Sequence, residues 1–374
     1  MEFKINYLEF NKAVLEVGRA ITYKDSLPIL TGIKVEAKMD HLILIGRNSH
    51  IAIKKVIPVS DKLSILQTGS IVVSAKYLEQ IIKRLPNNDI HFMVNENQSV
   101  TIKSNEITTK LNGLDDKEYP PLSESNSGSS LRIATEKLIS TIRKTVFAAA
   151  KAGTNPSLTG VNFLFEDDFL TCIATNSQRL SCKRLTVDSN INGSFIVPRH
   201  TLNEFDKLFG SYKTEIDVST TQTGIIFKSS TLSLYSKLIM GNYPNVTSLI
   251  SQDFGTKFVL NTKQLLRGIE RASIFAKEMK NNIIKLKIED EFSINISSGS
   301  SEIGQIEEKQ PIKFITGVKD LTISFDGNFI MEALKAINEE EVRLCFEGSL
   351  KPILLVPEGD NSHLQLVSPA RTRH

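Results

Sequence analysis

Cysteines, histidines and clustered carboxylates are the side chains in this sequence that could carry catalysis or hold a metal. The 6 histidines are scattered, and no spacing between them indicates a metal site. Cys172 and Cys182 fall on expected neighbouring strands, and we interpret them as buried thiols rather than nucleophiles. The acidic groups at 115–116, 167–168 and 339–341 fall at expected turns or helix ends, which favours solvated loop charge over a paired acid and base.

Nucleotide chemistry has no support in the sequence either. No Gly-x-x-x-x-Gly-Lys-Ser/Thr phosphate loop occurs, and no Gly-x-Gly-x-x-Gly follows an expected strand. Because no motif indicates a reaction, a cofactor or a resident metal, we expect a binding protein and not an enzyme. An enzyme site assembled between repeated units remains an alternative. Turnover that is lost on changing Asp167 or Asp168 would favour it.

Length and composition describe an ordinary globular chain. Of 374 residues, 40% are hydrophobic and 23% are charged, and the length predicts two or three domains. No unbroken apolar run is long enough for a membrane span, and the N-terminus lacks the layout of a secretory signal. With only 3 cysteines a disulfide framework is excluded, so we expect a cytoplasmic protein. The lack of Trp argues against a platform that stacks single-stranded bases.

The sequence repeats itself about every 128 residues. Leu30-Thr31-Gly32-Ile33 recurs as Leu158-Thr159-Gly160-Val161, and the same offset places Asn48-Ser49 on Asn176-Ser177. A further step of similar length starts a third copy near Phe258. Three units of this size account for the whole chain.

Each unit is expected to contain two helices and several antiparallel strands. The first helix of the second unit is expected over 135–152 with Thr135 as its N-cap, and that of the third unit over 261–280 with Asn261 or Thr262. A strand followed by a helix then recurs in every unit, with the strands at 70–74, 194–198 and 321–325. The fold class is therefore α+β, with helices packed on antiparallel sheets.

Two polar stretches mark the expected joins between the units. Residues 123–130 are rich in Gly and Ser and follow Tyr119-Pro120-Pro121, and residues 251–255 follow Tyr243-Pro244. The expected domains are residues 1–127, 128–254 and 255–374.

The net charge of +3 hides an uneven distribution of basic residues. Those on expected helices are Lys76, Lys83, Arg84, Lys137, Arg143, Lys144, Lys151, Lys263, Arg267, Arg271, Lys277 and Lys280. For a single helix, a solvated face with i, i+4 ion pairs explains such charge. Comparable basic faces in three repeats favour instead an extended positive surface that holds a polyanion by its phosphates without reading bases.

Four motifs add to the triplication, and they run in order along the chain: 27–30 (Leu-Pro-Ile-Leu), 174–180, 196–199 and 364–371. Together, and essentially from end to end, they resemble the bacterial sliding clamp family, the β subunits of DNA polymerase III. The resemblance implies three DNA-clamp domains that form half of a ring. Two chains would close head to tail around duplex DNA and tether a polymerase, as a processivity factor without a reaction of its own.

The resemblance also implies a pocket between the second and third domains for short linear peptides. Its partners would be the polymerase III catalytic subunit, the clamp loader and repair proteins. An apolar slot would take Leu or Phe anchors, and flanking polar groups would hold the peptide backbone. Carried onto this chain, the wall is Leu158, Thr175, Ser177, Gln178, Arg179, Leu180, Pro244, Leu249, Leu350, Pro352, Leu366, Val367, Ser368, Pro369, Ala370 and Arg371. For each aliphatic member, a place in the core is the alternative.

Three positions depart from the family's pocket. The usual motif reads Thr-Asp-Gly/Ser-His-Arg-Leu, whereas here Asn176 replaces the Asp and Gln178 replaces a His that can charge near neutral pH. Ser248 stands where an Arg is common, which removes a long stem that could cover apolar surface. We therefore hypothesise a divergent or second clamp with altered partner choice.

For DNA, the resemblance implies contacts by Lys24, by Arg199 and by the loop that carries Lys151. Helix position alone adds Lys137, Lys144, Lys263 and Arg267. For the ring seam, the family pairs an edge strand of the first domain with one of the third. Here this implies an apolar centre and a charged rim, formed by Lys103, Lys110, Leu111, Ile274, Phe275, Glu302, Glu307 and Glu308.

A scaffold that keeps the clamp fold but has altered or lost replication partners is the second hypothesis. DNA retention without steep salt dependence, or failure to stimulate a polymerase on a circular template, would favour it. A strict monomer at micromolar concentration would argue against the ring. Under either hypothesis we expect no cofactor and no membrane partner.

Overall fold

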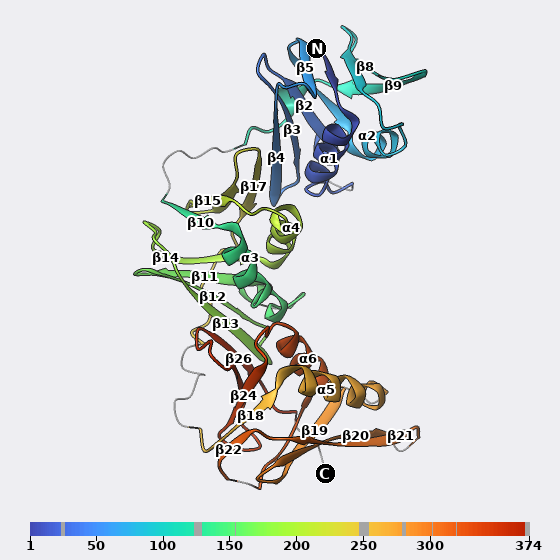
Figure 1. Ribbon diagram of the computed structural model, residues 1–374. Coiled ribbons are helices and arrows are strands. Elements are labelled where there is room, and N and C mark those ends of the chain that lie inside the picture. The colour runs from blue at the N-terminus through green and yellow to red at the C-terminus, as the bar shows by residue number, and fades with distance from the viewer. Residues whose placement is uncertain are drawn as a thin grey trace. The chain divides into compact units, whose positions relative to one another are not determined.

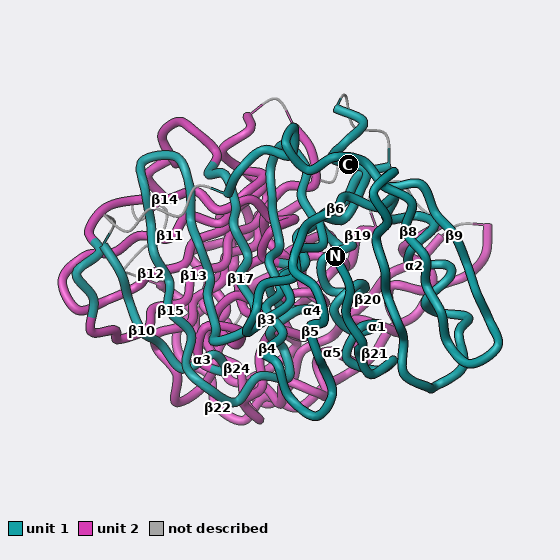
Figure 2. Tube along the Cα trace, turned by 90° about the horizontal axis from the view of Figure 1, so that it is seen from above, with its two compact units in different colours: residues 1–136, 189–191, 203–238 teal, residues 137–188, 192–202, 239–374 magenta. Residues whose placement is uncertain are grey.

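A computed structural model of the chain describes residues 1–23, 27–122, 129–153, 155–246, 254–278, 282–300, 302–318 and 320–370. The chain separates into two compact units, which are coloured in Figure 2. Unit 1 comprises Met1–Glu136, Ser189–Ile191 and Asn203–Leu238, and unit 2 comprises Lys137–Asp188, Asn192–Leu202 and Ile239–His374. The second repeat is divided between the units because its strands pair with both neighbouring repeats.

Unit 1 is built on one sheet whose strands pair in the order β10-β15-β16-β17-β4-β3-β2-β6-β9-β8-β7-β1-β5. Its strands are β1 (Glu2–Ile5), β2 (Gly32–Ala37), β3 (His41–Arg47), β4 (Ile51–Pro58), β5 (Leu63–Gln67), β6 (Gly69–Ser74), β7 (Ile90–Val94), β8 (Ser99–Ser104), β9 (Ile107–Leu114), β10 (Ser130–Ala134), β15 (Glu215–Thr220), β16 (Gly224–Lys228) and β17 (Leu232–Lys237). Helices α1 (Tyr7–Gly18) and α2 (Ala75–Ile82) pack against each other and against this sheet, as Figure 1 shows.

The sequence of α1 explains its position. Phe10, Ala13, Val14 and Val17 recur at helical spacing and form the buried face of the helix. Phe10 meets Phe3 and Phe92 edge-on, at ring-centroid distances of 5.9 and 6.0 Å. Such aromatic contacts add to the burial of apolar area, so α1 is held firmly on the sheet.

Unit 2 contains two sheets, with strand orders β14-β11-β12-β13-β26-β25-β24-β18-β22 and β21-β20-β19-β23. The strands of the first are β11 (Gly160–Glu166), β12 (Phe169–Thr175), β13 (Arg179–Thr186), β14 (Gly193–Pro198), β18 (Thr256–Asn261), β22 (Phe314–Gly317), β24 (Glu341–Phe346), β25 (Ile353–Pro357) and β26 (His363–Val367). Those of the second are β19 (Ile283–Asp290), β20 (Ser293–Ser300), β21 (Gly304–Pro311) and β23 (Thr322–Asp326). Helices α5 (Thr262–Ala276) and α6 (Gly327–Lys335) pack on each other.

The repeated Leu-Thr-Gly motif forms the same short turn twice. Thr31 Oγ1 donates to Pro28 O, and Thr159 Oγ1 donates to Pro156 O, both at 2.7 Å. The glycine that follows begins a strand at close approach, since a Cβ at Gly32 would lie 2.5 Å from a methyl of Val72. Only Gly fits where backbone and neighbour come this close.

The structure confirms the expected start of one helix and shortens another. Asn261 caps α5 by accepting from Gln264 N at 2.9 Å, so the expected helix start in the third repeat is confirmed. The helix expected over 135–152 is wrong in its second half, because α3 (Thr135–Arg143) ends nine residues earlier than expected. Thr145 leaves the helical region and turns its hydroxyl back onto Thr141 O at 3.0 Å.

The recurring strand–helix pairs are confirmed in all three repeats, as β6–α2, β14–α4 (Arg199–Phe209) and β23–α6. Every strand pair between described residues is antiparallel, and helices pack on the sheets, so the α+β class is confirmed. Among the described helices none is long and apolar enough to cross a membrane.

Candidate functional site

A polar turn after β12 carries several of the expected pocket residues. Thr175 Oγ1 accepts from Ser177 N at 3.1 Å and donates to Arg179 O at 2.6 Å. Asn176 Oδ1 accepts from the N–H groups of Gln178 and Arg179, both at 3.0 Å. These bonds hold Ser177 at a φ of +74°, a conformation that is costly for a residue other than Gly. Asn176 thus supplies the acceptor that an Asp would supply, and Gln178 remains exposed.

Arg179 is buried, and its guanidinium joins β13 to α6. It forms an ion pair with Glu332 and donates to Phe147 O at 2.7 Å. It also lies over the ring of Phe329, 4.7 Å from the centroid, where the ring face attracts the cation. Contrary to the expectation for this residue, the guanidinium of Arg179 therefore does not line an open pocket.

A buried ion cluster lies where β13 meets β26. Lys144 Nζ lies 3.4 Å from Glu339 Oε1 and 3.3 Å from Asp360 Oδ2, and Lys183 Nζ lies 2.6 Å from the same Asp360 oxygen. Lys144 is only 6% exposed, so its expected contact with DNA is wrong. Lys144 directly follows α3, and its ammonium points to Glu339 and Asp360 instead of to solvent. Glu339 belongs to this cluster and is not free loop charge.

His363 is fully buried beside this cluster, and neither ring nitrogen has a hydrogen-bond partner among the described residues. Burial lowers the pKa of His363 to about 4, and the positive charges of Lys144 and Lys183 act in the same direction. Burial raises the pKa of Asp360, but hydrogen bonds from Lys183 and Ser362 outweigh it and hold this pKa well below the ordinary value. The cluster therefore favours the neutral imidazole of His363 and the ionised carboxylate of Asp360.

The aliphatic residues of the expected pocket wall divide into two kinds. Leu180, Leu366 and Val367 are buried in apolar clusters, as the core alternative predicted. Leu158 is half-buried, whereas Leu350 is 78% exposed. Leu350 is therefore the member of this set whose apolar surface is most open to a partner side chain.

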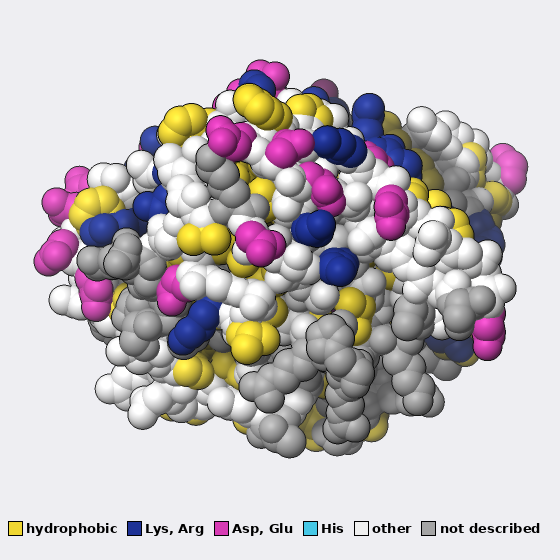
Figure 3. Space-filling view, turned by 90° about the horizontal axis from the view of Figure 1, so that it is seen from below, with side chains coloured by type: hydrophobic (Ala, Val, Ile, Leu, Met, Phe, Trp, Pro, Cys, Tyr) yellow, Lys and Arg dark blue, Asp and Glu magenta, His cyan; other side chains and the backbone are white. Residues whose placement is uncertain are grey.

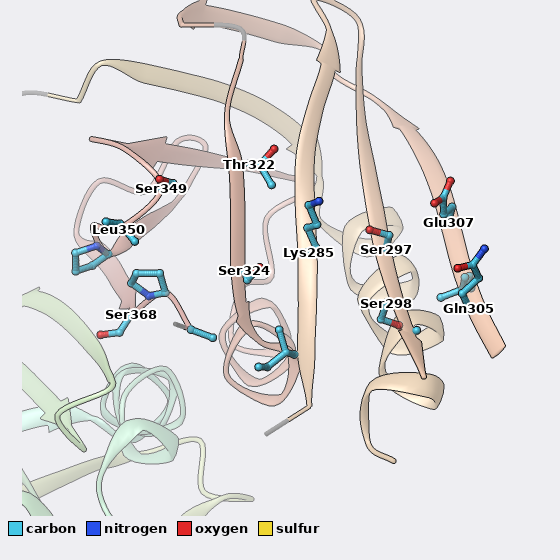
Figure 4. A pocket seen from close by; sticks show the side chains of 16 residues that line it. Lys285, Ser297, Ser298, Gln305, Glu307, Thr322, Ser324, Ser349, Leu350 and Ser368 are labelled. Atoms are coloured by element: carbon cyan, nitrogen blue, oxygen red, sulfur yellow. The ribbon is translucent and has the colours of Figure 1, made fainter. Parts of the chain in front are cut away.

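Leu350 stands at one end of a cavity of about 1300 Å³ in unit 2. Pro352 and Ser368–Ala370 line the same end, and the far end follows the polar face of β19, β20 and β21, as Figure 4 shows. Ala370 N donates to Ser324 O at 2.7 Å, which fixes this last described segment along β23. Pro244 is exposed, and Leu249, Ser248 and Arg371 lie outside the described residues.

The expected DNA contacts other than Lys144 lie at the surface wherever they are described. Lys137, Lys151, Lys263 and Arg267 are exposed. Arg199 is half-buried and donates to Ala149 O at 2.8 Å, so it is anchored next to the loop that carries Lys151. Burial lowers the pKa of Arg199, and the nearby charge of Arg179 lowers it further. Lys24 lies outside the described residues.

The expected seam residues lie on or beside two strands with an open edge. β9 pairs along its length with β8, but only Gly113 and Leu114 pair on its other side. β21 pairs with β20 alone among the described strands. Lys103, Lys110, Glu302 and Glu307 are exposed at or near these edges. An unpaired edge offers a row of free N–H and C=O groups to another chain.

Charge of both signs is interspersed on the face drawn in Figure 3, where Lys and Arg alternate with Asp and Glu. This agrees with the small net charge of +3. That face carries no broad field of one sign.

Comparison with known proteins assigns the family. Models of the DNA polymerase III beta subunit match residues 1–123 (N-terminal domain), 132–245 (central domain) and 247–371 (C-terminal domain). The beta sliding clamp of Bacillus subtilis is 37% identical over 378 residues, and that of Staphylococcus aureus is 36% identical over 377, each with 100% of both chains covered. The chain belongs to the DNA polymerase III beta subunit family, the bacterial sliding clamps.

Solved structures agree with this assignment. The sliding clamp of Bacillus subtilis superposes with a TM-score of 0.96 at 36% identity, and the beta subunit of Streptococcus pyogenes with 0.95 at 33%, again over 100% of both chains. The resemblance and the three-domain clamp fold are thereby confirmed. This clamp is a DNA polymerase processivity factor and not an enzyme, and DNA and a polymerase are the partners of its family. The domain boundaries and the individual site residues stay predictions.

Sequence reasoning missed the partners of the buried charges. Glu332, Lys183, Asp360 and His363 were not expected at any site, and no local spacing links them to Lys144. The one available signal was charge density near the third repeat's acidic run at 339–341. Their meeting depends on the pairing of β13 with β26, which brings together segments about 180 residues apart along the chain.

Replacing His363 by Leu is expected to reduce the acid sensitivity of folding. The pKa of His363 is about 4 in the folded chain and about 6.5 in the unfolded one, so only the unfolded chain binds a proton in this window. Folding stability is therefore full above about pH 6.5 and loses about 3 kcal/mol by about pH 4 through this group. Urea unfolding of the wild type and variant at about pH 7.5 and 4.5 measures the difference.

His200→Leu, an exposed histidine on α4, is the matched control and should keep the wild-type pH dependence. If the His363→Leu variant lost stability toward low pH as steeply as the wild type, this would contradict the role given to His363.

Proposed function

We propose that two copies of this clamp close head to tail into a ring around duplex DNA in the cytoplasm. In this proposal the ring holds the polymerase III catalytic subunit, the clamp loader and repair proteins by short linear peptides. The observation that carries the proposal is the presence of two open strand edges with opposite charge, on β9 and β21. A heterologous contact between such edges generates a closed ring when the curvature is right.

The residues around these edges support a seam with an apolar centre and a charged rim. Ile274 is 64% exposed, and Phe275 and Leu111 are half-buried in the single chain, so they offer apolar area to a second copy. Lys110 stands on the first edge, on β9, and Lys103 stands on the neighbouring strand β8. Glu302, Glu307 and Glu308 lie at the second. Glu308 is held by Arg271 of its own chain through bonds of 2.7 and 2.6 Å, which leaves Glu302 and Glu307 for the partner.

Exposed cations support the proposed grip on DNA. Lys263 and Arg267 stand four residues apart on α5, and neither has an ion-pair partner among the described residues. Lys137 and Lys151 are exposed in the same way, and Arg199 anchors the loop of Lys151. Lys144 no longer belongs to the set. Free cations that meet phosphates release counterions and read no bases, which suits a clamp that slides.

The cavity beside Leu350 supports the peptide pocket. Leu350 is an exposed apolar anchor point that lines this cavity together with Pro352 and Pro369, and it would take a Leu or Phe side chain. In this proposal the turn at Gln178 would contact the peptide as well. Gln178 keeps one charge state at all pH values, unlike the His of the family motif. This difference supports the hypothesis of altered partner choice.

Replacing Lys263 and Arg267 together by Ala is expected to weaken equilibrium binding of the clamp to short linear duplex DNA. The slope of log affinity against log salt should become shallower by about 2, since each phosphate contact contributes roughly 1. A salt series with labelled DNA measures the slope. Lys228→Ala, at an exposed lysine on β16, should leave it unchanged. An unaltered slope in the double variant would contradict a contact between α5 and DNA.

Reversing the charge of one edge is expected to break the ring. Lys103→Glu with Lys110→Glu should raise the dimer dissociation constant by at least about tenfold, and so should Glu302→Lys with Glu307→Lys. The variant that carries all four changes should dimerise again, because opposite charges then face each other. Size-exclusion chromatography with light scattering measures the mass. Persistent dimers in both double variants, or a monomeric fourfold variant, would argue against this seam.

Replacing Gln178 by His is expected to make peptide affinity depend on pH. For a fluorescent peptide with a carboxylate beside its Leu and Phe anchors, the variant should bind at this pocket more tightly as pH falls through about 6.5, whereas the affinity of this pocket in the wild type should not change. Leu350→Asp should remove binding at this pocket in both backgrounds. Affinities equal to those of an ordinary clamp for several partner peptides would defeat the hypothesis of altered partner choice.

A further inference from the structure

Unit 1 contains a cavity beside a turn that corresponds by repeat to the turn at Asn176–Arg179, where the peptide pocket is expected. Its volume is about 200 Å³, and it lies between the turn at Asn48–Ile51, the segment at Pro121–Leu122 and the strands β16 and β17. We call it the first-repeat pocket. The repeat offset of 128 residues places its turn on the turn at Asn176–Arg179, so the two pockets can be compared bond by bond.

The two turns have the same hydrogen bonds. Asn48 Oδ1 accepts from His50 N at 2.8 Å and from Ile51 N at 2.9 Å. Asn176 Oδ1 accepts from the equivalent N–H groups, both at 3.0 Å. The main chain closes in the same way, since Asn48 N donates to Ile51 O at 2.9 Å and Asn176 N donates to Arg179 O at 3.3 Å.

The adjacent walls also correspond. Lys237 N donates to His50 O at 2.9 Å where the chain leaves β17, and Ser368 N donates to Gln178 O at 2.8 Å where it leaves β26. A Tyr-Pro segment borders each pocket in the sequence. In the first-repeat pocket this segment is fixed by Arg47, whose Nη1 donates to Pro120 O at 2.9 Å and to Pro121 O at 3.1 Å.

The lining of the first-repeat pocket indicates an acidic ligand with an apolar anchor. Its apolar part includes Ile51, Ile225 and Leu122, and its basic residues are Arg47, His50 and Lys237, with no Asp or Glu. The side chains of His50 and Lys237 are exposed and have no ion-pair partner among the described residues. Basic groups around an apolar slot attract a carboxylate and select against basic peptides.

The size of the cavity decides between ligand classes. Drug-sized ligands occupy cavities of roughly 300 Å³ or more. A cavity of about 200 Å³ accommodates one or two anchor side chains instead, and the open turn leaves room for the rest of a chain.

We propose that the first-repeat pocket binds a short acidic peptide with a Leu or Phe anchor, so that each clamp chain offers two peptide sites. The ligand class rests on the proposed function, because it is taken from the pocket that corresponds by repeat. The location and the charge preference rest on unit 1 alone. The occupant is a segment of a partner protein that carries carboxylates next to its apolar anchor.

Calorimetric titration of the full-length clamp with the hexapeptide Glu-Asp-Leu-Ala-Leu-Phe tests the proposal. The wild type is expected to bind two peptides per chain. The double variant with His50→Glu and Lys237→Glu should lose one of these sites, with at least a tenfold weaker affinity, because both changes place negative charge in an otherwise basic lining without touching the turn's main-chain bonds. Leu350→Asp should lose the other site. Lys228→Glu, an exposed strand lysine outside the lining, should keep both.

The outcomes separate the two proposals. One site per chain that only Leu350→Asp removes would overturn the first-repeat pocket and leave the proposed function standing. One site that only the double variant removes would support the first-repeat pocket and count against the peptide pocket at Leu350. No binding by the wild type would overturn both for this class of peptide. Circular dichroism of each variant establishes that it is folded.

Discussion

The strand pairs β4–β17 and β13–β26 are the contacts on which the rest of the structure depends. Each joins a strand of one repeat to a strand of the next, from Leu232 opposite Lys55 to Ser236 opposite Ile51 in the first pair, and in the same way in the second. Because main-chain bonds cross each junction, two repeats share one continuous sheet. Each junction also places a polar turn beside the end of the partner strand, and at the first junction this turn lines the first-repeat pocket.

Buried charge makes the second junction specific. Lys144 and Lys183 share Asp360, and Arg179 pairs with Glu332, so several ions leave water where the middle repeat meets the last. Such pairs add little net stability compared with apolar side chains, but a missing partner leaves an uncompensated charge. A slip of β26 by one residue along β13 would separate these partners and turn its core residues outward. We interpret the cluster as a device that fixes register.

The sequence predicted whatever depends on local spacing. The repeat offset located the turns at Asn48 and Asn176, and the spacing of apolar residues located most helices. It did not predict that α3 stops at Arg143. The hydroxyl of Thr145 bonds locally to Thr141 O and Ile142 O, and a Thr with such bonds can also stand inside a helix that continues. Nor could the sequence predict that Lys144 is buried, since its acidic partner lies 216 residues away. Helical periodicity indicates on which side of a helix a residue lies, but it does not indicate which distant carboxylate packs against the end of that helix.

A small net charge is compatible with holding DNA if the hold is topological. A protein that binds only by phosphate contacts needs many cations, and its affinity falls steeply with salt. In the proposed ring, DNA is kept as long as the seam stays shut, so a few exposed cations, Lys263 and Arg267 among those proposed, would suffice to orient the duplex. Interspersed charge, as on the face in Figure 3, would then limit non-specific attachment. If the proposed seam is right, the edges of β9 and β21 set the lifetime on DNA, and the basic residues determine how freely the ring slides.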